Sequence, residues 1–155
     1  MAGRIDARLT ELGIELPQAG KALAAYVPFV RTGNQLFISG QVPLWNGEVR
    51  YKGKLGADMD IDTGRAAART CALNIIAQAK AALDGDLDRV VRVVKLVGFV
   101  NSMPDFTDQP KVINGASELM AEVFGEAGTH ARSAVSAASL PLGVAVEVEA
   151  IIEVA

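Results

Sequence analysis

The chain has 155 residues, half of them hydrophobic, and a formal net charge of −3. This length fits one domain over residues 1–155, and the apolar content excludes intrinsic disorder. The acidic balance leaves no excess of cations for a phosphate backbone, which disfavours nucleic-acid binding. A single cysteine, a charged start and short apolar runs predict a soluble cytoplasmic protein with no membrane helix.

The first elements are a short helix and a β-hairpin. Apolar residues recur at helical spacing from Ile5 to Leu12, which predicts a helix within an N-terminal extension over residues 1–20. Residues 26–43 contain two β-rich runs separated by a Thr-Gly-Asn turn, the pattern of an antiparallel hairpin. A short third strand is expected at residues 49–51.

A long helix and a long strand follow. An apolar stripe that ends at Leu83 predicts a helix with either Asp62 or Thr63 as its N-cap. The nearly continuous β-branched run over residues 90–101 predicts a strand in the middle of a sheet.

The last third of the chain predicts one more helix and two strands. A second apolar stripe starts near Pro110 and is closed by Gly125. Residues 131–154 indicate two strands joined by a turn at 140–143, and in the second strand apolar residues alternate with glutamates.

This order of elements predicts an α/β (α+β) two-layer sandwich. We expect a mixed sheet of about six strands with two long helices on one face. The other face then needs a cover, and identical subunits are the commonest one. Oligomerisation is therefore expected.

Most catalytic signatures are missing from the sequence. It has no phosphate-binding glycine loop and no nucleophile elbow, and one cysteine with one histidine cannot build a metal site. We expect no metal and no organic cofactor.

Five residues remain as candidates for chemistry. Cys71 lies on an apolar helix stripe and is expected in the core, and His130 is expected to be a surface or turn histidine. Arg132 opens a small, apolar strand, so it either binds an anionic ligand or pairs with a glutamate of the last strand. Glu147 is interpreted first as a solvated or interface carboxylate. Tyr26 is either a pocket rim residue or a packed edge-strand tyrosine.

Three segments resemble one known family. They are GNQLFISGQVP at residues 33–43, Asn74–Ile76 followed by LDRVVRVVKLVGFV, and ARSAVSAASLPLGVAVEVEAI near the C-terminus. Their order and spacing over residues 20–155 are similar to the RidA family, also called YjgF-type proteins, the reactive-intermediate imine and enamine deaminases. The last segment is the most specific.

The resemblance implies a chorismate-mutase-like fold and a homotrimer with a cleft between each pair of subunits. It implies that Arg132 grips the carboxylate of a small 2-imino or 2-oxo acid, while Glu147, with the carbonyl of Ala134, orients the attacking water. The implied catalytic residues are Arg132 and Glu147. The implied substrate-binding residues are Tyr26, Ser39, Gly40, Asn114, Arg132 and Ala134. Ala134 stands where many active members have a cysteine, which indicates a divergent subgroup.

Three hypotheses for function follow. The first is a deaminase that hydrolyses small 2-imino or 2-enamino acids, such as 2-iminopropionate from 2-aminoacrylate, to 2-oxo acids and ammonia. The second is a non-catalytic trimer that binds a small carboxylate as a sensor or regulator. The third is an endoribonuclease, which the acidic composition makes the weakest.

Overall fold

The computed structural model describes residues 3–22 and 24–155. The helices are α1 (Arg4–Glu11), α2 (Ile61–Ala82) and α3 (Gln109–Phe124), with short 3-10 turns η1 (Leu87–Arg89), η2 (Gly125–Gly128) and η3 (Pro141–Gly143). The strands are β1 (Phe29–Thr32), β2 (Gln35–Gln41), β3 (Leu44–Trp45), β4 (Glu48–Val49), β5 (Val90–Asn101), β6 (Ala131–Ala137) and β7 (Val146–Val154). None of the helices in these residues is long and apolar enough to cross a membrane.

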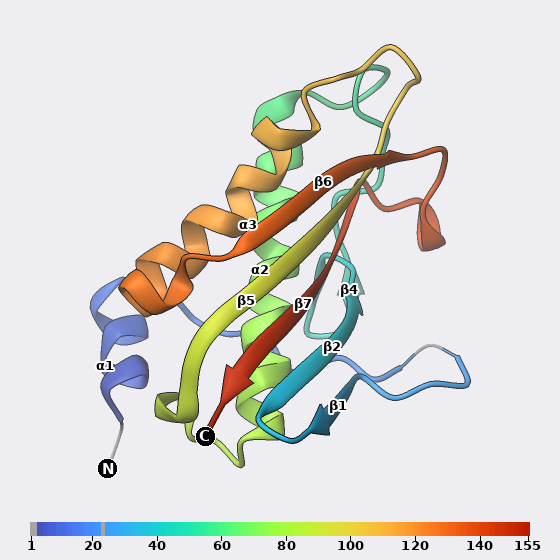
Figure 1. Cartoon of the computed structure of the whole chain (residues 1–155). Coiled ribbons are helices and arrows are strands. Elements are labelled where there is room, and N and C mark those ends of the chain that lie inside the picture. Colours follow the sequence, from blue (N-terminus) through green and yellow to red (C-terminus); the bar gives the residue numbers. More distant parts are fainter. Residues whose placement is uncertain (1–2, 23) are drawn as a thin grey trace.

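The main sheet has the order β1-β2-β7-β5-β6. Its neighbours are antiparallel except β5 and β6, which run parallel and are connected through α3. Figure 1 shows α2 and α3 behind this sheet, on one of its faces. The predicted two-layer mixed architecture is therefore confirmed.

The described residues place five strands in the main sheet, where the sequence predicts about six. The strand expected at 49–51 pairs instead as β4 with β3 in a separate two-stranded sheet. Asn46 and Gly47 have positive φ and form the tight turn between β3 and β4. Tyr51 also has a positive φ, 55°, which ends the extended backbone after β4. After β4, the chain meets the segment before β7 through an isolated bridge between Lys52 and Val144 and the hydrogen bond from Ala145 N to the Tyr51 carbonyl oxygen.

Helix α2 begins two or three residues earlier than predicted, depending on which of the two expected N-caps is taken. Asp60, and neither Asp62 nor Thr63, is the N-cap, and its carboxylate accepts the backbone N–H of Thr63 over 2.8 Å. Hydrogen bonds from the side chain and the backbone N–H of Thr63 lower the pKa of Asp60. The prediction missed Asp60 because all three residue types suit a cap and only the backbone conformation selects one of them.

The core lies between the two long helices and the sheet. Gly115 allows the closest approach of the helices, since a Cβ there would lie 2.1 Å from the backbone oxygen of Arg65. The core also contains Cys71, which is fully buried, and burial raises the pKa of its thiol well above the usual value. The expectation that Cys71 is a core residue is confirmed.

Helix α1 packs on the far end of α3 (Figure 1). Ile5 and Leu9 enter the core, and the Asp88 carboxylate accepts the backbone N–H groups of Arg4 and Ile5 at 2.8 Å each. The first two residues of the predicted extension lie outside the described residues. Helix α1 therefore packs against α3 and η1 at the outside of the two-layer sandwich. None of its residues lines the pocket described below.

The other face of the sheet carries exposed apolar side chains. Val30 is 53% exposed, Phe37 41% and Val135 45%. The strand register places Val30 beside Phe37 and Phe37 beside Ile151. This face agrees with the sequence expectation of a surface that needs a cover.

Candidate functional site

A β-bulge shapes the end of β2. Ile38 pairs with Ala150 and Gln41 pairs with Val148, so Ser39 and Gly40 together oppose one residue of β7. The Ser39 hydroxyl donates to the Val27 carbonyl over 2.8 Å and fixes the segment before β1. Bulges often re-aim the chain next to active sites, and this one brings the segment of Tyr26 over the strand end.

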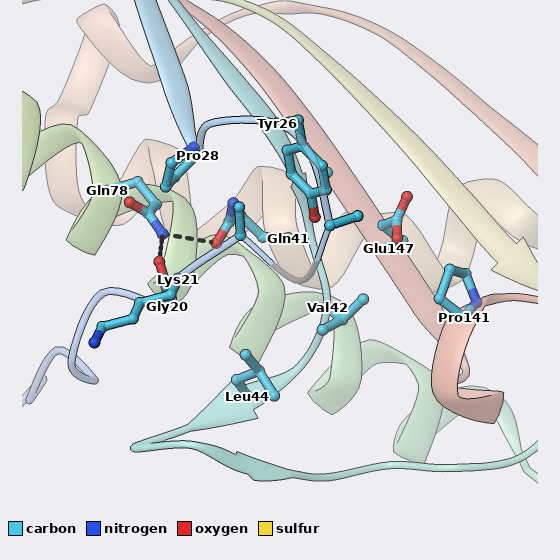
Figure 2. A pocket seen from close by; sticks show the side chains of 13 residues that line it. Gly20, Lys21, Tyr26, Pro28, Gln41, Val42, Leu44, Gln78, Pro141 and Glu147 are labelled. Atoms are coloured by element: carbon cyan, nitrogen blue, oxygen red, sulfur yellow. Dashed lines mark hydrogen bonds between the residues drawn. The ribbon is translucent and has the colours of Figure 1, made fainter.

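Beside the bulge lies a pocket of about 210 Å³. Figure 2 shows Glu147 and Pro141 at one end, Gln78 and Lys21 at the other, and Tyr26 between them. The pocket is lined by Gly20, Lys21, Ala22, Ala24, Tyr26, Pro28, Gly40, Gln41, Val42, Leu44, Gln78, Pro141 and Glu147. It thus brings together three of the predicted site residues, Tyr26, Gly40 and Glu147, whereas Ser39 supports the pocket from outside its lining.

Two buried glutamines, which the sequence analysis missed, close the inner end of the pocket. Gln78 of α2 donates to the carbonyl oxygen of Gly20 over 2.7 Å and to Gln41 Oε1 over 3.4 Å. Gln41 in turn donates to the Ser39 carbonyl oxygen. The signal in the sequence for Gln78 is a polar residue at an apolar stripe position of a helix, and Gln41 stands in the quoted segment at residues 33–43.

Glu147 is half-buried at the wall of the pocket. Burial, with a smaller contribution from the nearby Glu149 carboxylate, raises the pKa of Glu147 from its ordinary value of 4.5. A Cβ on Gly40 would lie 2.6 Å from Glu147 Oε2, so glycine at that position makes room for the carboxylate. A carboxylate with a raised pKa is a stronger base than an exposed one.

Arg132 lies apart from this pocket, between β6 and α3. Its Nη1 donates to Asn114 Oδ1 over 2.8 Å and to Ser117 Oγ over 3.3 Å. No carboxylate of residues 3–22 or 24–155 lies within salt-bridge distance of this guanidinium. The alternative of an ion pair with a glutamate of the last strand is therefore not formed within the chain.

Arg132 and Glu147 lie on opposite faces of the sheet. Arg132 is paired with Leu96 and Glu147 with Phe99, three residues further along the same strand β5. Because successive residues of a strand face opposite sides, an odd separation places the two partners on different faces. Ala134, two residues after Arg132, shares the face of Arg132 and Asn114. One copy of the chain does not bring the two predicted catalytic residues together.

Ser117 was not among the predicted site residues, and the prediction for His130 is correct only in part. Ser117 lies one helical turn after Asn114 on the same face of α3, and that spacing was the available signal. His130 is in the expected turn between η2 and β6 but is half-buried, with its nitrogens 2.9 Å from Ser117 Oγ and 2.6 Å from the Gly128 carbonyl oxygen.

Comparison with known proteins gives the family. Residues 6–154 match the family model described as "YjgF/chorismate_mutase-like, putative endoribonuclease". The chain belongs to this family, the YjgF/RidA family, and has its mixed α+β, chorismate-mutase-like fold. The resemblance seen in the sequence is thereby confirmed.

Individual relatives extend over nearly the whole chain. Protein TCP17 of Trypanosoma cruzi is 53% identical over 153 residues, 98% of this chain and 95% of TCP17. The crystal structure of Atu1372 from Agrobacterium tumefaciens, described as of unknown function, has 52% identity and a TM-score of 0.91, and the match covers 97% of this chain and 92% of that one. E. coli TdcF with bound serine has 26% identity and a TM-score of 0.65, covering 91% of this chain and 97% of TdcF.

Proposed function

We propose that the protein is a hydrolase that deaminates small 2-imino and 2-enamino acids to 2-oxo acids and ammonia. The observation that carries this proposal is the environment of the Arg132 guanidinium. Its guanidinium is half-buried and held at one nitrogen by neutral groups, and no carboxylate of the described residues neutralises it. A partly desolvated cation of this kind favours an anion from outside the chain.

The relatives support a small carboxylate as that anion. TdcF is described with bound serine, a small amino acid with one carboxylate. In Arg132 the Nε and Nη2 hydrogens point along one edge of a planar fork, which matches the two oxygens of a carboxylate. A 2-imino acid such as 2-iminopropionate carries this carboxylate next to the reacting carbon.

The chemistry requires one water molecule and one base. Glu147 accepts a proton as the water oxygen bonds to the imine carbon and the C=N electron pair moves to nitrogen. That proton passes to the nitrogen and gives a carbinolamine, with one hydroxyl and one amino group on the same carbon. Glu147 then moves the hydroxyl proton to the amino nitrogen, the C–N bond breaks as the C=O bond forms, and ammonia leaves a 2-oxo acid. The carbonyl oxygen of Ala134 helps to orient the water, and the imine carbon is electrophilic without any cofactor.

The proposed site lies between copies of the chain. Arg132, Asn114 and Ala134 come from one copy, and Glu147, Gly40 and Tyr26 come from the next, because the two groups lie on opposite sides of one sheet. The exposed apolar face supports a homotrimer, in which three such clefts form. A cytoplasmic location and a single domain over residues 1–155 stay predictions.

The test is turnover of 2-iminopropionate, generated in the assay from alanine by an amino-acid oxidase. We expect ammonia release above the spontaneous rate. Arg132→Ala should abolish both this activity and pyruvate binding with little change in Tm. Arg50→Ala, which removes an exposed cation near Glu48 and Trp45, is the matched control and should change neither.

Two results would contradict the proposal. A large fall in Tm with normal pyruvate binding would give Arg132 a structural role through its hydrogen bonds to Asn114 and Ser117. Pyruvate binding without any turnover would instead favour the carboxylate-binding sensor. RNA cleavage abolished by Arg132→Ala would favour the endoribonuclease of the family description, which a net charge of −3 disfavours.

A further inference from the structure

A chain of hydrogen bonds runs from Arg132 into the protein. Arg132 Nη1 donates to Ser117 Oγ over 3.3 Å, Ser117 Oγ lies 2.9 Å from His130 Nε2, and His130 Nδ1 lies 2.6 Å from the Gly128 carbonyl oxygen. A carbonyl oxygen only accepts, so Nδ1 of a neutral His130 carries the proton. Its Nε2 then accepts from the Ser117 hydroxyl, whose oxygen is left to accept from Arg132.

This chain completes the anchoring of one guanidinium nitrogen. Nη1 has two hydrogens, of which Asn114 accepts one and Ser117 the other. All five N–H bonds of a guanidinium lie in one plane. Two acceptors at Nη1 therefore fix both the position and the rotation of that plane, whereas one acceptor leaves the plane free to swing.

We propose that Ser117 and His130 are positioning residues that hold the Arg132 guanidinium in the plane in which its Nε and Nη2 meet a substrate carboxylate. The inference rests on the proposed function of Arg132. Neither residue touches the substrate. Their contribution is to reduce the freedom that the guanidinium loses when a carboxylate binds in two-pronged geometry.

The test compares Ser117→Ala and His130→Ala with the unaltered protein. We expect Kd for pyruvate and KM for 2-iminopropionate to rise about 2- to 10-fold, the factor that one hydrogen bond of ordinary strength contributes. The kcat should change less than twofold, because Glu147 and its water are not affected. The double variant should resemble either single variant, since both changes break the same chain of hydrogen bonds.

A rescue variant separates positioning from packing. In His130→Gln the side-chain amide oxygen can accept from the Ser117 hydroxyl in place of Nε2, so Kd and KM should return to within twofold of the original values. Thr10→Ala is the matched control, because it removes a hydroxyl on α1 that donates to the backbone carbonyl oxygen of Asp6. It should leave Kd and KM unchanged.

The failures of the two proposals look different. If the unaltered protein neither binds pyruvate nor turns over the imine, the proposed function fails and this inference with it. If Arg132→Ala loses binding while Ser117→Ala and His130→Ala keep the original Kd and KM, only the positioning role is overturned. The positioning role is also overturned if His130→Ala lowers Tm and raises Kd, and His130→Gln does not restore Kd.

Discussion

Glu147 combines a position beside the pocket with a pKa suited to a base. If its carboxylate takes the proton of water, Glu147→Gln keeps the size and the hydrogen-bonding capacity of the side chain but removes the base. We expect the single-turnover rate of imine hydrolysis to fall about 10² to 10⁴-fold, while calorimetric binding of pyruvate survives. An unchanged rate would remove Glu147 from the mechanism and leave Arg132 with backbone groups.

The raised pKa of Glu147 has a consequence for the pH profile. A raised pKa keeps the carboxyl protonated to higher pH, so the base is lost as pH falls through that raised value. Glu149 contributes to the shift through its negative charge. Glu149→Gln should therefore move the acid limb of kcat/KM to lower pH. A limb that stays in place, or moves upward, would show that Glu149 does not act on this carboxyl.

The resemblance in the sequence named Tyr26, Gly40 and Glu147 together, and these three residues line one pocket. Ser117 was not predicted, because its spacing one helical turn after Asn114 places it on the same helix face but does not show that Arg132 of β6 reaches both residues. The ion-pair alternative for Arg132 depended on which face of the sheet it occupies, and that face follows from the register with β5. Register is set by tertiary pairing and not by the local pattern.

At the scale of the elements, the long periodic segments were predicted well and the short ones were not. Strand β5 has the predicted bounds, and α3 ends at Gly125, because both carry long apolar patterns with clear end signals. The hairpin β3-β4 has two residues in each strand. Such a short segment shows no periodicity, so its sheet partner could not be predicted.

The contact between α2 and α3 fixes the helix that carries Asn114 and Ser117. Replacing glycine by alanine inside a helix usually stabilises it, but at Gly115 the added Cβ would clash with the backbone oxygen of Arg65. We expect Gly115→Ala to destabilise the fold by about 1–3 kcal/mol through overpacking, seen as a lower Tm in calorimetry. Lys111→Ala, an exposed change on the same helix, should leave Tm nearly unchanged. A Tm equal to or above the original would mean that the helices can separate without cost.

At the scale of the whole molecule, one sheet carries the two groups of proposed site residues on opposite faces. Its helix-covered side carries Arg132 with its anchors, and its open side carries Glu147 near exposed apolar residues. Association through the open face would bury those apolar side chains and join the two groups from neighbouring copies in one step. Assembly and activity are thereby expected to depend on the same surface.

This arrangement can be tested by mixing two inactive variants. Arg132→Ala retains Glu147, and Glu147→Gln retains Arg132, so a cleft built from one copy of each can contain both intact residues. In a cyclic trimer every mixed assembly has one such cleft out of three, so the purified mixed trimers should have about one third of the original activity. The two variants, carrying different tags, are co-expressed, and the doubly tagged trimers are purified and assayed beside each variant alone. If both residues of a site came from the same chain, the mixed trimers would be as inactive as the separate variants.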